Sequence, residues 1–194
     1  MADHANTDFV ALNIAVLTLS DTRTPDNDTS GDVLVERLEA EGHQLGDRAI
    51  IKDDIYLLRA QVSQWIADPA IQAVLITGGT GFTARDTTPE AVLPLFDKQI
   101  EGYGELFRQL SFAQIGSSTV QSRAVAGVAN RTAIFCMPGS TGACRLAWDS
   151  IIKEQLDARH KPCNFVEMLS MTGTGFCKGE RKGERKGERK GERK

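Results

Sequence analysis

Uninterrupted apolar runs, separated by segments of helical pattern, constrain the fold of this chain more than any other feature. The runs are LNIAVLTL at residues 12–19, AVLI at residues 73–76 and TAIFCM at residues 132–137. A strand with one solvent-facing side alternates apolar and polar residues, whereas a strand covered on both faces is apolar along its length. We therefore expect these runs to be strands of a sheet that carries helices on both faces.

The segments between the runs predict helices with recognisable ends. Residues 28–30 (Asp-Thr-Ser) offer N-caps for a helix that ends at Gly42, and Asp53 or Asp54 can cap the next helix. Further helices are expected at residues 105–112, at residues 119–128 and from residue 139 onward.

The sequence TTPE at residues 87–90 also has the form of a helix start. Thr87 can cap this helix, Pro89 suits its first turn, and Glu90 lies three residues after Thr87, as in a capping box. Pro94 is expected to keep the helix short or bent.

Strand and helix alternate along the chain, and this alternation predicts an α/β fold with a mostly parallel sheet and right-handed crossovers. At 194 residues the chain is long enough for one such domain and too short for two. We expect an N-terminal extension at residues 1–10, the domain at residues 11–165 and a C-terminal tail at residues 166–194. Ligands of such folds bind at the carboxyl ends of the strands, so the loops that follow the runs are the candidate sites.

The tail contains a Lys-Gly-Glu-Arg repeat from residue 178 onward, which has no apolar side chain to bury. It is predicted to be disordered and is given no role in the chemistry, although an electrostatic tether to an anionic partner is the alternative. The chain carries a net charge of −3, and its last 17 residues contribute +5, so the preceding residues carry about −8. This acidic body argues against a nucleic-acid partner.

The sequence also bears on the compartment. No run approaches the roughly 20 apolar residues that a membrane-spanning helix needs, and the first ten residues lack the pattern of a secretion signal. The four cysteines, Cys136, Cys144, Cys163 and Cys177, show neither a CxxC pair nor zinc-site spacing and are interpreted as structural. A cytoplasmic protein with no membrane partner is therefore expected.

A glycine-rich turn, TGGTG at residues 77–81, follows the second apolar run. Glycines there permit positive φ and bring main-chain N–H groups close to a ligand, so an anion can bind near the following helix N-terminus. The Gly-Lys-Ser/Thr ending of a P-loop and the dinucleotide GxGxxG pattern are both absent. For the glycines alone, a plain tight turn is the favoured interpretation.

Arg85 and Asp86 extend this turn with two opposite charges, for which a merely tight turn has no use. Asp86 is a candidate magnesium ligand, since magnesium usually takes one or two carboxylates together with substrate phosphates. A second helix cap near Thr87 is the alternative interpretation of Asp86.

Three other segments should reach the same edge of the sheet. Ser20 follows the first run, Asp53 follows a further strand expected to end at Ile51-Lys52, and the turn at residues 138–140 (Pro-Gly-Ser) follows the third run. These residues are also ordinary turn formers and helix caps. Arg123, further along, is expected either to clamp a phosphate or to pair with a carboxylate.

Taken together, these motifs resemble the molybdopterin-binding family, which includes the bacterial molybdopterin adenylyltransferases and the G domain of gephyrin. The resemblance covers residues 9–164, nearly the whole globular part. Its details, such as LITGGTG at residues 75–81, QSRAVAGVAN at residues 121–130 and MPGST at residues 137–141, are similar to the MoaB branch in particular.

The resemblance implies a three-layer α/β/α fold, assembly into homotrimers or homohexamers, and two small-molecule partners, ATP and molybdopterin. Active members of the family use Mg²⁺ and ATP to adenylylate the terminal phosphate of molybdopterin, with release of pyrophosphate. By position, Asp53 and Asp86 match the catalytic, metal-associated carboxylates of the family. The residues matched to substrate or nucleotide contacts are Ser20, Gly78, Gly79, Thr80, Gly81, Glu105, Ser122, Arg123, Pro138, Gly139 and Ser140.

The chain departs from the family pattern at two places. Active members commonly have proline before the second-strand aspartate and again after the Pro-Gly turn, where this chain has Lys52 and Thr141. The alternative function is therefore that of a non-catalytic molybdopterin-binding or scaffold protein of the same pathway.

Overall fold

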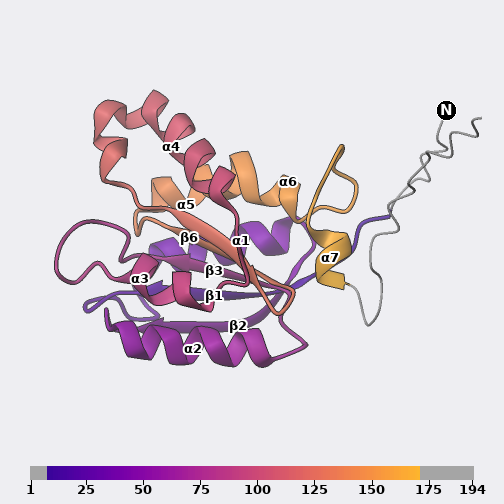
Figure 1. Cartoon of the computed structure of the whole chain (residues 1–194), viewed down its shortest axis with the longest axis horizontal. Coiled ribbons are helices and arrows are strands. Elements are labelled where there is room, and N and C mark those ends of the chain that lie inside the picture. The colour runs from indigo at the N-terminus through magenta and orange to yellow at the C-terminus, as the bar shows by residue number, and fades with distance from the viewer. Residues whose placement is uncertain (1–7, 171–194) are drawn as a thin grey trace, which may run out of the picture.

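The computed structural model describes residues 8–170, so the Lys-Gly-Glu-Arg repeat and Cys177 lie outside the described residues. One six-stranded sheet, in the order β2-β1-β3-β6-β5-β4, forms the middle layer (Figure 1). Strands β2, β1, β3 and β6 run parallel, and the β6-β5 and β5-β4 pairs are antiparallel. The strands are β1 (Asn13–Leu19), β2 (Gln44–Ile51), β3 (Ala73–Thr77), β4 (Lys98–Gln99), β5 (Val125–Ala129) and β6 (Thr132–Met137).

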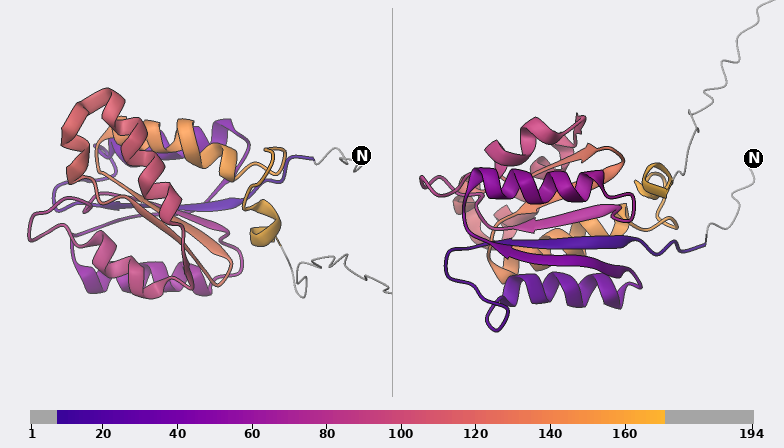
Figure 2. Two further views of the ribbon diagram at one scale, coloured as in Figure 1. Left: turned by 45° about the horizontal axis from the view of Figure 1, so that its top comes forward. Right: turned by 90° about the horizontal axis from the view of Figure 1, so that it is seen from below.

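Helices cover both faces of this sheet, which makes three layers (Figures 1 and 2). One face carries α1 (Thr29–Ala40), α4 (Glu101–Ile115) and the long helix formed by α5 (Thr141–Ala147), η3 (Trp148–Ile152) and α6 (Lys153–Gln155). The other face carries α2 (Ile55–Ala67) and α3 (Thr88–Val92), which is followed by η1 (Leu93–Leu95). The predicted α/β fold with a mostly parallel sheet is confirmed.

The burial of β1 shows why residues 14–17 in its middle are all apolar. Ile14 and Val16 pack into the core under α1 and α4, whereas Ala15 and Leu17 pack into the core under α2. Each of these four side chains is completely buried. Successive residues of a strand point to opposite faces, so a strand with two covered faces buries the side chains on both sides.

The N-caps predicted for α1 and α2 are present in the structure. For α2, the structure also shows which of two neighbouring aspartates is the cap. Asp28 caps α1 by accepting a hydrogen bond from the N–H of Gly31. Asp54, and not Asp53, caps α2, because its carboxylate accepts hydrogen bonds from the N–H groups of Tyr56 and Leu57. The carboxylate of Asp53 is thereby left for another role.

The predicted capping box at the start of α3 is wrong. Thr87 is the N-cap residue, but its hydroxyl makes no capping hydrogen bond. Glu90 does not reach back to the helix start either, because it forms an ion pair with Arg123.

The helix expected at residues 119–128 is also wrong. A short 3-10 helix, η2 (Gly116–Gln121), is followed by strand β5, which pairs with β6 in a hairpin. Asn130 and Arg131, with φ of 46° and 67°, form the tight turn of this hairpin. Positive φ at both central residues is the requirement of a two-residue hairpin turn.

The end of the described chain returns to the core. Helix α7 (Val166–Ser170) buries Val166 and Leu169 against the same layer as α1. Cys136 and Cys144 are buried, as expected of structural cysteines, but Cys163 is exposed in the loop before α7 and is not a core residue. Within residues 8–170, every helix is too short or too polar to cross a bilayer.

Candidate functional site

A cleft of about 600 Å³ opens at the carboxyl ends of β1, β3 and β6. Its walls are the loop after β1, the glycine-rich turn after β3, the turn after β6 and the region where α4 meets η2. Of the residues predicted from the sequence, the cleft is lined by Ser20, Asp53, Gly78, Gly79, Thr80, Gly81, Asp86, Ser122, Pro138 and Gly139. Loops from separate strands therefore meet in one cavity, as the parallel topology predicts.

Three of the predicted site residues do not line this cleft. Glu105 and Arg123 line a neighbouring cavity of about 440 Å³. Ser140 caps α5, since its hydroxyl accepts a hydrogen bond of 3.2 Å from the N–H of Ala143.

The glycine-rich turn depends on its glycines. Gly78 and Gly79 have φ of 107° and 62°, in the left-handed region that favours glycine. A Cβ at Gly79 would lie 2.4 Å from the hydroxyl oxygen of Thr88. That hydroxyl donates a hydrogen bond of 2.8 Å to the carbonyl of Gly78, so α3 holds the turn in place.

Asp86 is fixed and ionised beside this turn. Its carboxylate accepts a hydrogen bond of 2.8 Å from the N–H of Thr83. Burial acts to raise the pKa of Asp86, but hydrogen bonds from Thr83 and Gly81 and the charge of Arg123 outweigh it, so the pKa lies below the ordinary value. A carboxylate held in this way is a stable negative charge at neutral pH.

Asp53 faces the same cleft in a different electrostatic setting. Burial, together with the negative charges of Asp21 and Asp86, raises the pKa of Asp53, and the charge of Arg85 partly opposes this shift. The carboxylates of Asp53 and Asp86 therefore repel each other across one cavity. A cation between them would relieve that repulsion.

Arg85 forms an ion pair with Asp21 beside the cleft, with distances of 2.6 and 2.7 Å from Nη2 to the two carboxylate oxygens. Both side chains are exposed, and they join the loop after β1 to the loop after β3. This pair connects two loops that both line the cleft.

The residues present fit a magnesium ion that arrives with a phosphorylated ligand. Residues 8–170 contain no cluster of three or more metal-ligating side chains. Asp53 and Asp86 supply two carboxylates, which is the usual number when substrate phosphates provide the other oxygens. This donor set does not suit an ion that is bound permanently by the protein.

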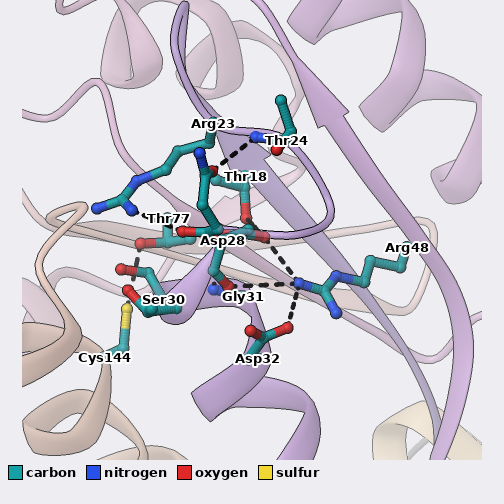
Figure 3. A network of polar contacts seen from close by, with 12 residues as sticks. Thr18, Arg23, Thr24, Asp28, Ser30, Gly31, Asp32, Arg48, Thr77 and Cys144 are labelled. Carbon is teal, nitrogen blue, oxygen red and sulfur yellow. Dashed lines mark hydrogen bonds and ion pairs between the residues drawn. The ribbon is translucent and has the colours of Figure 1, made fainter.

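A buried polar network below the cleft was missed by the sequence analysis (Figure 3). The carboxylate of Asp28 is completely buried and accepts hydrogen bonds from the hydroxyl of Thr18 (2.8 Å), the N–H of Gly31 (3.0 Å) and the guanidinium of Arg48 (2.9 Å). Arg48 also donates to Asp32, at 2.8 Å. The only signal in the sequence was a cap position at Asp28, which does not reveal burial.

Ser30, beside this network, connects two parts of the cleft wall. Its hydroxyl donates a hydrogen bond of 2.7 Å to the carbonyl of Gly139. This hydrogen bond joins the first turn of α1 to the turn that follows β6 and leads into α5. The N-termini of α1 and α5 therefore both lie at the cleft.

Comparison with known proteins decides the family. Residues 15–158 match the family described as "Probable molybdopterin binding domain". The chain belongs to this molybdopterin-binding family. The resemblance drawn from the sequence motifs is thus confirmed.

Individual relatives within the molybdopterin-binding family agree. The chain is 59% identical over 160 residues to "Molybdenum cofactor biosynthesis protein B" of Escherichia coli (strain K12), covering 82% of this chain and 94% of that protein. A crystal structure of a molybdenum cofactor biosynthesis protein B superposes with a TM-score of 0.74 and 42% identity, covering 79% of this chain and 94% of the other. The tungsten cofactor synthesizing protein MoaB from Pyrococcus furiosus superposes with a TM-score of 0.68 and 32% identity, covering 75% and 92%.

Proposed function

We propose that this chain acts in molybdenum-cofactor biosynthesis by adenylylating molybdopterin. In the proposed reaction an oxygen of the pterin's terminal phosphate attacks the α-phosphorus of ATP, the bond to the β-phosphate oxygen breaks, and pyrophosphate leaves. The names of the relatives support the pathway. The observation that carries the chemistry is that Asp53 and Asp86, from different loops, line one cleft with the glycine-rich turn.

The two carboxylates would hold magnesium together with the phosphates of ATP. When bound, magnesium supplies neutralisation of phosphate charge and of the leaving pyrophosphate. Asp86 is suited to this because its lowered pKa keeps it ionised, and Asp53 because a cation offsets the burial and the repulsion that raise its pKa. Both residues therefore gain from the same cation.

The remaining task of the protein is to position the substrates. The glycine-rich turn has no side chains at Gly78, Gly79 and Gly81, so a phosphate can approach the main chain closely. No nucleophile from the protein is needed, because the attacking oxygen belongs to the pterin phosphate. The cleft of about 600 Å³ would enclose the reacting phosphates and part of each substrate.

Self-association belongs to the same proposal. Three large apolar side chains on α4 and η2 are exposed, namely Phe112 (60%), Ile115 (54%) and Val120 (72%). Neighbouring exposed apolar side chains of this kind mark interaction surfaces. They support self-association that covers this region, while the homotrimer or homohexamer itself is what the family resemblance implies.

Incubation of the purified chain with ATP, molybdopterin and magnesium chloride tests the reaction. Mass spectrometry should detect adenylyl-molybdopterin, and a coupled assay should detect an equal amount of pyrophosphate. Chelation of magnesium with EDTA should stop both. An absence of product above the protein-free background would refute the proposed reaction.

A non-catalytic pterin-binding or scaffold function is the second candidate. It is favoured by Lys52, an exposed residue that stands directly before Asp53 where active family members commonly have proline. Molybdopterin binding without turnover, unchanged in Asp86→Ala, would select this function.

A further inference from the structure

Arg123 reaches from the segment between η2 and β5 to the loop that carries Asp86. Its Nε donates a hydrogen bond of 2.8 Å to the carbonyl of Gly81, and its Nη2 donates one of 2.7 Å to the carbonyl of Asp86. These two carbonyls are the two ends of the loop at residues 81–86. One guanidinium group therefore holds both ends of the loop.

Three further contacts anchor Arg123 itself. Its Nη1 forms an ion pair with Glu90 in the first turn of α3. Its main-chain N–H donates a hydrogen bond of 3.1 Å to the carbonyl of Thr80, one residue before the loop. The guanidinium also lies 5.2 Å from the ring centre of Phe82, within the loop.

These contacts leave little of Arg123 for a substrate. Each of the three guanidinium nitrogens already donates to the protein, and the side chain is only 23% exposed. Arg123 does not line the cleft, although it stands directly behind the cleft-lining loop. These contacts use three of the five guanidinium N–H groups, and the remaining two belong to a side chain that does not line the cleft.

Inside the loop, a second set of hydrogen bonds orients the carboxylate of Asp86. The N–H of Thr83 donates to that carboxylate at 2.8 Å, and the N–H of Asp86 donates to the carbonyl of Thr83 at 3.0 Å. The orientation of the carboxylate is therefore set by the shape of the loop. The shape of the loop is in turn held by Arg123.

We infer that Arg123 is a positioning residue that binds both ends of the loop at residues 81–86 and so fixes the Asp86 carboxylate in the cleft that Asp53 also lines. The catalytic consequence of this inference rests on the proposed adenylylation, whereas the contact between Arg123 and the loop does not. A planar guanidinium presents five donors in a fixed fork and can hold two carbonyls at once. A lysine ammonium keeps the charge but lacks that fork.

Arg123→Lys is the informative variant, and amide hydrogen exchange is the readout that needs no turnover. Exchange of the amides at residues 81–86 should accelerate by about tenfold or more, because the loop opens locally without its two carbonyl contacts. Arg159→Lys, the same substitution in an exposed ion pair with Asp157, is the matched control and should leave that loop unchanged. Glu90→Gln, which removes one anchor of Arg123, should give a smaller acceleration in the same residues.

The kinetic readout separates positioning from substrate binding. In Arg123→Lys, kcat should fall by roughly 10- to 100-fold while KM for ATP changes by less than about threefold, because a misplaced carboxylate impairs the reaction more than nucleotide binding. A raised KM for ATP with kcat retained would show that Arg123 binds phosphate and would overturn the inference.

Unchanged exchange at residues 81–86 in Arg123→Lys would also overturn the inference. If Arg123→Lys does not fold, exchange of the same amides at the wild-type rate in Glu90→Gln would overturn the inference instead. If the wild-type chain does not adenylylate molybdopterin, the proposed function alone is refuted. The exchange measurement tests separately whether Arg123 holds the loop.

Discussion

Arg48, on the outer strand β2, donates a hydrogen bond of 2.9 Å to the completely buried carboxylate of Asp28 below the cleft. Buried carboxylates are costly unless they are paired and hydrogen-bonded, and Arg48 supplies the only opposite charge in this network. The pair connects the edge of the sheet to the start of α1 and to the cleft wall.

Replacement of Arg48 should therefore destabilise the fold. Arg48→Met keeps most of the apolar stem but leaves Asp28 buried without its cation. We expect the free energy of unfolding to fall by about 2–3 kcal/mol, below the usual range for a broken buried pair because Arg48 is 27% exposed. Urea denaturation measures this change.

Arg37→Met is its matched control, since Arg37 pairs with the exposed Asp149. It should cost less than about 1 kcal/mol. Equal losses in the two variants would contradict the importance given to the burial of Asp28.

Asp86→Asn should stop the proposed adenylylation and leave the fold intact. The amide oxygen can still accept the hydrogen bond from Thr83, but the negative charge that would hold magnesium is lost. We expect turnover to fall by on the order of 100-fold or more, since charge stabilisation is usually the largest catalytic contribution. Product formation and thermal melting should be measured on the same preparation.

Asp54→Asn provides the control for that experiment. Asp54 is beside Asp53 in the sequence, but its carboxylate caps α2, where asparagine is an equally good cap. Activity and melting temperature should both stay near the wild-type values. Parallel loss of activity, pterin binding and stability in Asp86→Asn would instead show that Asp86 is structural.

The same substitution at two glycines should have opposite effects. Gly79→Ala places a Cβ 2.4 Å from the Thr88 hydroxyl at a φ of 62°, so it should destabilise the fold by about 1–3 kcal/mol. Gly142→Ala, in α5, places its Cβ in open space and should stabilise by up to about 1 kcal/mol. Chemical denaturation of both variants compares them directly, and equal shifts would contradict the role given to the turn.

The sequence could predict those elements whose environment leaves a local pattern. The run at residues 132–137 coincides with β6, because a strand covered on both faces is mostly apolar along its length. The position of the cleft followed from topology, since loops after parallel strands share one edge of the sheet.

Strand β5 could not be predicted, because tertiary packing selects its residues. Gly127 lies against the ring of Phe96, where a Cβ would be 2.3 Å from the ring atoms, and Ala126 is completely buried. Small residues that are required because space is limited show no strand periodicity. The sequence of residues 119–128 therefore predicts a helix instead.

The sequence does not reveal the hydrogen-bond partners of the polar side chains either. Arg123 binds a carbonyl 42 residues away, and Arg48 binds a carboxylate 20 residues away. The sequence left Arg123 as either a phosphate clamp or the partner of a carboxylate. The structure shows the carboxylate pairing, with Glu90, and adds the two main-chain contacts that neither alternative contained.

His43 should make the stability of the fold depend on pH. Its Nδ1 accepts a hydrogen bond of 3.2 Å from the N–H of Leu12, so the neutral ring is the form that fits. Burial lowers the pKa of His43 below 6.5, and the charges of Asp157 and Glu41 oppose this shift only partly. The unfolded chain therefore binds this proton more readily than the folded chain.

Since the folded pKa is the lower one, the contribution of His43 is complete above about pH 6.5 and is lost as the pH falls through that value toward the folded pKa. Carboxylates with lowered pKa, such as Asp157, lose their contribution only in more acidic solution, because their unfolded value is 3.8. As the pH is lowered from about 7.5 to 5.5, the free energy of unfolding should therefore decrease, mainly because of His43. In His43→Asn, whose side-chain oxygen can accept the hydrogen bond without titrating, the decrease should be much smaller, and an unchanged slope would assign it to other groups.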